Sequence, residues 1–130
     1  MDKIIDSVSG RVAKIIFVLP LIMFGLNHLT MANAMAGMVP SFVPGGVFWV
    51  YVTGIALIAG SVGIVTNLKG LGKLAAFLTG VLILIFAFTI HLPNMLNAPD
   101  EQARMMPMIG FMKDLAIGAA CWIAAATYKD

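Results

Sequence analysis

Four long apolar runs constrain this chain more than any other feature of its sequence. Each is close to the ~20 residues that an α-helix needs to cross the ~30 Å hydrocarbon layer of a membrane. The connections between them leave no room for a soluble domain. We therefore predict one all-α domain, a transmembrane four-helix bundle, with helices at about residues 12–29, 47–66, 71–92 and 107–128.

The composition agrees with a membrane protein and excludes two other classes. The 130 residues are 61% hydrophobic and 11% charged, whereas soluble domains are about half apolar and a quarter charged. The net charge of +2 comes from residues near the predicted helix ends, so there is no basic patch for a nucleic acid. The single cysteine, Cys121, lies in the fourth run and excludes an intramolecular disulfide or dithiol relay.

The first apolar run has two interpretations. Pro20 lies inside it and predicts a kinked helix. A basic start, an apolar core and small residues at positions 32–36 also resemble a secretory signal peptide. The run ends in Asn27 and His28 rather than in a plain apolar core, which favours a retained helix.

Prolines suggest where the other helices begin and end. Residues 30–46 contain two prolines and a Gly-Gly pair, which predict a loop with room for a short interfacial helix. Pro93 directly follows the end of the third run and predicts that this helix stops there. Pro107 predicts the first turn of the fourth helix.

The basic residues predict the orientation. Lys or Arg in loops marks the cytoplasmic side of a membrane protein. Arg104 is alone in the two connections 31–46 and 93–106. We therefore predict a multi-pass protein of the inner (plasma) membrane with both termini cytoplasmic, because the other side carries Lys3, Arg11, Lys14, Lys69, Lys73 and Lys129.

The fourth run contains a carboxylate, Asp114, beside Lys113. A charge within a membrane span costs roughly 3 kcal/mol, so Asp114 should face the bundle interior and find a partner there. The residues that share its face at helical spacing are small, which predicts close contact with another helix: Gly110, Gly118, Cys121 and Ala125. Two further faces are suited to helix contact: Ala56, Gly60 and Gly63 in the second run, and Gly80, Leu84, Ala87 and His91 in the third.

Polar and aromatic side chains gather in the half of the bundle away from the termini. A carboxylate beside an imidazole fixes its tautomer, which suits proton exchange with a bound redox molecule or ligation of a metal. We predict His28, His91 and Asp114 as catalytic residues. The predicted binding residues of the same cavity are Asn27, Trp49, Tyr51, Asn94 and Lys113.

Other roles for these residues stay open. Polar residues near helix ends often only anchor the membrane interface or satisfy one another, and Lys113 can extend outward or pair with a lipid phosphate. Eight of the ten methionines lie in the same half as the two histidines. Their thioethers suit Cu(I), but methionine is also a flexible apolar filler, and no fixed ligand spacing assigns a metal site.

Three motifs together resemble the DoxX family of small four-helix membrane proteins. They are FGLNHL in the first run, MVPSFVPGGVFWVYVTGIALIAG at residues 38–60, and HLP at the end of the third run. The similarity covers nearly the whole chain and is most specific in residues 38–60. Family members often have a glutamate shortly after the Thr-Gly of this motif, where this chain has Leu57 and Ile58, so no shared acidic site is transferred.

The resemblance implies a membrane partner in redox metabolism. Relatives in that family include a subunit of a thiosulfate:quinone oxidoreductase and a component associated with oxidative-stress enzymes. We expect a membrane subunit of a redox complex, such as a subunit of a quinone-linked oxidoreductase, that binds a quinone or another small amphipathic molecule. Its other expected partners are membrane lipid and a protein partner or second copy. The alternatives are a non-catalytic scaffold or assembly factor and a Met/His Cu(I)-binding protein.

Overall fold

The computed structural model describes residues 1–129, which form helices joined by turns and short connections. Four helices are long and apolar enough to cross a membrane. The all-α class and the four long apolar helices are thereby confirmed, and they indicate a multi-pass membrane protein. The spans are Asp2–Thr30, Val47–Thr66, Gly72–Leu96 and Glu101–Ala126.

The first span begins ten residues earlier than the sequence predicted. It consists of α1 (Asp2–Ser7), a π-helical segment (Val8–Val12) and α2 (Ala13–Thr30). The polar start was expected to lie outside the helix, but Asp2 is in the first turn, where a negative charge favours helix formation. The helix also continues through Pro20, as transmembrane helices tolerate proline.

The connection after the first span is partly helical, as the sequence allowed. It contains α3 (Ala32–Met35) followed by a single 3-10 turn (Ala36–Met38). The second span, α4 (Val47–Thr66), has the predicted bounds. A tight turn then leads into the third span, with Asn67 Oδ1 accepting a hydrogen bond from the amide of Gly72 at 2.8 Å.

The third span does not stop at Pro93. It runs through α5 (Gly72–Phe86), a π-helical segment (Ala87–His91) and α6 (Leu92–Leu96). In a regular α-helix the proline ring collides with the carbonyl four residues earlier. The wider π turn directly before Pro93 changes that geometry, so the helix continues to Leu96.

The fourth span, α7 (Glu101–Ala126), also begins earlier than predicted. Asp100 caps it, its side chain accepting a hydrogen bond from the amide of Ala103 at 2.7 Å. This cap satisfies a backbone donor that the first turn would otherwise leave free. Pro107 therefore lies inside the helix rather than in its first turn.

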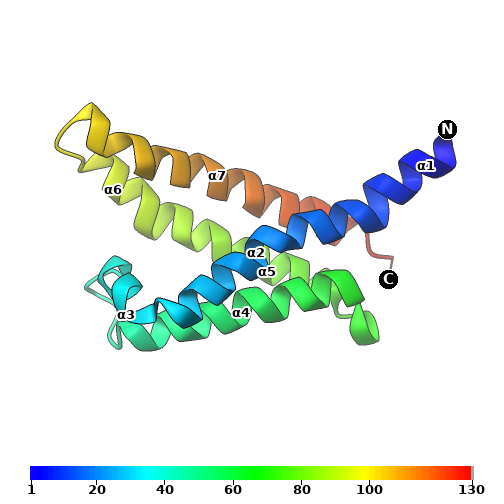
Figure 1. The fold of residues 1–130 in the computed structure, drawn as a ribbon, viewed down its shortest axis with the longest axis horizontal. Helices are drawn as coiled ribbons and strands as arrows, with labels where there is room; N and C mark the ends of the chain where they lie inside the picture. The colour runs from blue at the N-terminus through cyan, green and yellow to red at the C-terminus, as the bar shows by residue number, and fades with distance from the viewer. Residues whose placement is uncertain (130) are drawn as a thin grey trace.

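The helices pack in the order α2 on α4, α4 on α5, and α5 on α7 (Figure 1). Both termini lie at one end of the bundle, which we call the terminal end (Figure 1). At the opposite end, the far end, the α2–α4 pair and the α6–α7 pair diverge (Figure 1). Two clusters of buried side chains join the helices in the terminal half and the middle: Val18, Ile64, Ala76 and Ala125, and then Leu21, Leu57 and Ile83.

The predicted small-residue face of α7 is its buried face. Gly110, Asp114, Gly118, Cys121 and Ala125 are the buried residues of this helix. The predicted face of α5 lies against it. A Cβ at Gly118 would come within 2.7 Å of Leu84 Cγ, and one at Gly80 within 3.0 Å of Cys121 Cβ. The glycines therefore set how closely α5 and α7 approach.

The small residues of α4 have more than one neighbour. Gly63 faces α5, where an added Cβ would lie 2.6 Å from Ala75 Cβ. Gly54 faces α2, where an added Cβ would lie 2.8 Å from His28 Cβ. Ala56 is exposed, so only part of the predicted face of α4 makes a helix contact.

Candidate functional site

The buried carboxylate of Asp114 has two partners at the far end of the bundle. Its side chain is 3% exposed; Lys113 Nζ lies 2.8 Å from Oδ1, and His91 Nε2 lies 3.3 Å from Oδ2. A carboxylate can only accept, so Nε2 of His91 carries the hydrogen that it donates. The prediction that Asp114 faces inward and meets a partner is confirmed.

Gly110 makes space for the ring of His91. A Cβ at Gly110 would lie 2.5 Å from Nδ1 and 2.7 Å from Cε1 of that ring, so any side chain there would displace it. Gly110 stands one turn before Asp114 on the same face of α7. The same helix thus supplies both the carboxylate and the gap that lets the imidazole reach it.

Lys113 links the cluster to the first span. Its Nζ lies 4.4 Å from the centroid of the Phe24 ring on α2, within the range of a cation–π interaction. The side chain of Lys113 is 40% exposed, in contrast to Asp114. The ammonium group of Lys113 therefore compensates the charge of the buried Asp114 carboxylate, while the Lys113 side chain stays partly exposed.

His28 lies close to this cluster but is bound differently. Its Nδ1 is 2.7 Å from the carbonyl oxygen of Phe24, one turn earlier in α2. Its ring stacks on Phe86 of α5, with centroids 6.2 Å apart and an interplanar angle of 18°. Within residues 1–129, the ion-pair partners of Asp114 are Lys113 and His91, and His28 is not among them.

Two cavities lie around these side chains. The smaller, about 180 Å³, is lined by His28, His91, Lys113 and Asp114 together with apolar residues. The larger, about 400 Å³, is almost wholly apolar and lies between the connection 35–43, the start of α4 and the end of the third span. Five residues line both cavities: His28, Met35, Met38, Phe86 and Ile90.

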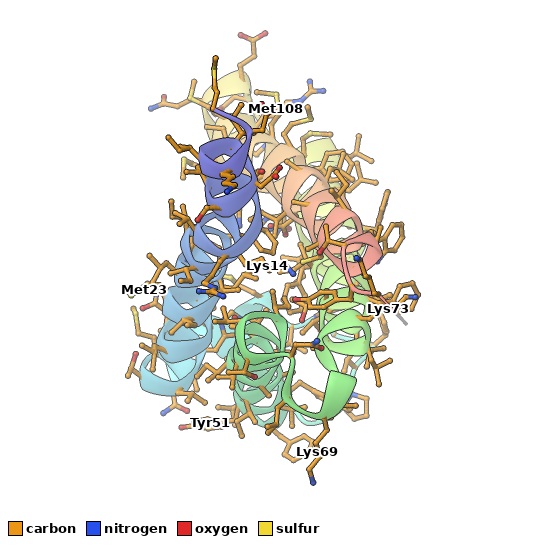
Figure 2. All side chains as sticks on the ribbon, turned by 90° about the vertical axis from the view of Figure 1, so that its right-hand side faces the viewer. Lys14, Met23, Tyr51, Lys69, Lys73 and Met108 are labelled. Atoms are coloured by element: carbon orange, nitrogen blue, oxygen red, sulfur yellow. The ribbon has the colours of Figure 1, made fainter. Side chains whose placement is uncertain are left out.

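The other predicted site residues divide into two groups. Trp49 lines the larger cavity, and its Nε1 donates a hydrogen bond to the carbonyl of Pro44 at 2.7 Å. Asn27, Tyr51 and Asn94 are exposed and line neither cavity. Tyr51 points away from the bundle, as Figure 2 shows. The structure thus gathers His28, His91, Asp114, Lys113 and Trp49 and leaves these three outside.

Sequence reasoning missed the aromatic and thioether walls of the site. Phe24 lies beneath Lys113, Phe86 stacks on His28, and Met35 and Met38 line both cavities. The spacing of four between Phe24 and His28 was a usable signal, because such residues share a helix face. Nothing in the local sequence marks Phe86, whose role depends on the contact between α2 and α5.

A metal site built from His, Cys, Asp and Glu requires several of these side chains close together. Within the described chain, no group of three or more His, Cys, Asp or Glu side chains is placed to hold a metal ion. His91 and Asp114 form an ion pair, and His28 lies outside it.

Comparison with protein-family models, with curated proteins and with solved structures finds no match for this chain. The resemblance to the DoxX family stays a prediction from the sequence motifs.

Proposed function

We propose that this protein is an inner-membrane subunit of a redox-associated complex and binds a quinone-like or other small amphipathic molecule at the far end of its bundle. The observation that supports this most directly is the pair of cavities that share His28 as a wall. One is apolar and the other contains an ion pair, as a molecule with an apolar body and a polar head requires.

The size and lining of the larger cavity suit such a ligand. Its volume of about 400 Å³ falls within the range of about 300 to 1,000 Å³ for small-molecule sites. An apolar ring or tail would lie against Trp49 and the methionines, with its polar head toward Lys113 and His91. We assign Asn27, Tyr51 and Asn94 to the membrane interface, since they lie outside both cavities.

The proposed chemistry is proton exchange between the ligand and His91. Oδ2 of Asp114 lies 3.3 Å from Nε2 of His91 and keeps the ring hydrogen on that nitrogen. Nδ1 is then the basic nitrogen of the neutral ring. Lys113 compensates the carboxylate. His28 supplies a second imidazole to the wall of the same cavity, and electrons would pass to or from a partner subunit.

The orientation and the partners belong to the same proposal. The basic residues at the terminal end favour cytoplasmic termini. The site would then open toward the outer face of the membrane. The resemblance to the DoxX family supports a partner in redox metabolism. The exposed apolar surface of the helices would be covered by lipid and by that partner or a second copy.

Tryptophan fluorescence tests ligand binding directly. The chain has two tryptophans: Trp49 lines the larger cavity, whereas Trp122 stacks on Phe77 elsewhere on the bundle. In a Trp122→Phe variant, a short-tailed benzoquinone should quench Trp49 saturably. In the Trp49→Phe control, the remaining Trp122 should show only the weak, linear quenching of a probe dissolved in detergent. Equal quenching of both would contradict a site at Trp49.

A mass spectrum of protein purified in native lipid separates this proposal from its rivals. A co-purified quinone or related molecule is the expected result. A protein that carries no small molecule in any preparation would favour the scaffold. Copper remains the second candidate, because His28 shares a cavity with the thioethers of Met35 and Met38. Stoichiometric copper after mild purification would favour that site.

A further inference from the structure

The hydrogen on His28 has a defined position. The carbonyl of Phe24 can only accept, and it lies 2.7 Å from Nδ1 of His28, so Nδ1 must carry the hydrogen. In the neutral ring the other nitrogen, Nε2, is then a hydrogen-bond acceptor. The ring stacks on Phe86, and His28 Cβ packs close to Gly54, where an added Cβ would lie 2.8 Å away.

Nε2 of His28 is open to a ligand. In the part of the chain that the structure describes, Nε2 takes part in no hydrogen bond, and no buried side-chain nitrogen or oxygen lacks a partner. Nε2 is therefore not sealed within the protein. Because His28 lines both cavities, this acceptor lies where a molecule in the larger cavity would meet the polar cluster.

The larger cavity offers no competing side-chain hydrogen. Trp49 Nε1–H donates to Pro44, the Thr53 hydroxyl to Val50 at 2.9 Å, and the Thr89 hydroxyl to Ile85 at 2.7 Å. These are the other polar side chains among the described residues that line it. The polar side-chain atoms left open there are acceptors.

We propose that this site prefers a ligand that donates a hydroxyl hydrogen to Nε2 of His28, so that it takes the reduced hydroquinone in preference to the quinone. This rests on the proposed function. A quinone oxygen only accepts and would meet another acceptor at His28, whereas a hydroquinone donates. Lys113 can donate to an oxygen of either form, and His91 lines only the smaller cavity, so in the larger cavity His28 is the side chain that distinguishes them.

Three probes of matched shape test the preference in wild-type protein. They are a short-tailed benzohydroquinone, its oxidised quinone, and its bis-methyl ether, which has no hydroxyl hydrogen. Calorimetric titration under anaerobic conditions should give a Kd for the hydroquinone about tenfold below those of the other two, the value of one net hydrogen bond. Equal affinity for all three overturns the inference and leaves the proposed function standing. No binding of any probe counts against both.

Two variants of His28 locate the effect. In His28→Asn the amide nitrogen takes the place of Nδ1 and keeps a donor for Phe24, but the acceptor at Nε2 is lost. Its affinity for the hydroquinone should fall about tenfold, to that of the ether. His28→Gln places an amide oxygen near the position of Nε2 and should recover part of the preference.

The matched control is Thr89→Val. It removes a polar group from the wall of the same cavity without removing a free hydrogen, since the Thr89 hydroxyl already donates to Ile85. The preference should be unchanged. A full preference retained in folded His28→Asn would overturn the assignment to His28. The comparison of hydroquinone with its ether in wild type needs no variant, so it decides the inference even if the His28 variants fail to fold.

Discussion

The terminal end and the far end of the bundle are built from the same four spans but are filled differently. At the terminal end all four contribute to one cluster, in which Val18, Ile64 and Ala76 are almost completely buried. At the far end the helices diverge around two cavities and a carboxylate (Figure 1). Stability should therefore depend mainly on the terminal half, and ligand binding on the far half.

The largest predicted difference between the two ends is their side of the membrane, because only one of them should be accessible from outside the cell. A single cysteine introduced at Ala98, in a Cys121→Ala background, should react with an impermeant thiol reagent added to intact cells, because the distribution of basic residues predicts that the far end lies outside. A reporter fused after Lys129 should be cytoplasmic. Labelling at Ala98 only after the membrane is broken would reverse the orientation and the outward-facing site.

A large side chain introduced between α5 and α7 should reduce the free energy of unfolding more than any other change. Gly118→Ile should lower the free energy of unfolding by about 3 kcal/mol, because even a Cβ there would come within 2.7 Å of Leu84. Ala119→Ile, at an exposed position of the same helix, should cost less than about 1 kcal/mol. Thermal unfolding in detergent measures both. Equal stability of the two variants would show that α7 is not held against α5 at this point.

Neutralising the carboxylate should affect both stability and binding. Asp114→Asn keeps the shape but leaves the ammonium of Lys113, 2.8 Å away, without its counter-charge. Loss of one partner of a buried pair costs about 3 to 5 kcal/mol, and the partial exposure of Lys113 should reduce this to about 2. Quinone binding should be lost, since Asp114 also fixes the tautomer of His91.

The double variant Lys113→Met/Asp114→Asn separates the two effects. Removing the uncompensated ammonium should restore part of the stability, while binding, measured by Trp49 quenching, should stay lost. If a stably folded Asp114→Asn protein bound quinone at the wild-type affinity, the carboxylate would have no part in the site.

A change at the terminal end should have the smallest effect and leave binding intact. The hydroxyl of Tyr128 donates to the carbonyl of Ile64, and Lys14 Nζ lies 3.8 Å from the centroid of the Tyr128 ring. Lys14 is labelled in Figure 2, which views the bundle from this end. Tyr128→Phe keeps the ring and should cost about 1 kcal/mol. An altered quinone affinity would show that the two ends are coupled.

The same tyrosine predicts a pH dependence. Burial raises the pKa of Tyr128 above its ordinary value of 10.0. A raised pKa in the folded state stabilises the protein below the unfolded value, and this contribution is lost as the pH rises through the folded value. The stability difference between wild type and Tyr128→Phe should therefore shrink above pH 10. A difference that is constant with pH would contradict this.

The sequence predicted the spans and the buried face of α7, because both follow from the spacing of apolar and small residues. It misplaced three boundaries. The first helix begins ten residues before its predicted start, and the weight given to Pro93 and Pro107 hid the π turn before the first proline and the Asp100 cap before the second. It predicted an inward carboxylate because an acid within a span needs a partner.

The choice of partner could not be read from the chain. Both histidines were candidates, and His91 reaches Asp114 because Gly110 leaves space for its ring. The stack of Phe86 on His28 depends on how α2 and α5 lie across the bundle. Contacts between elements of this kind carry no periodic signal along the sequence.

The π-helical segment Ala87–His91 separates the packing of its span from the direction of His91. A π turn contains about one residue more than an α turn. The residues beyond it are therefore rotated about the helix axis relative to a continuous α-helix, while the preceding helix stays in register. Gly80 and Leu84 keep their places against α7, and the direction of His91 is set independently of them. The direction of the imidazole thus depends on this segment, whereas the packing of the membrane bundle depends on the helix before it.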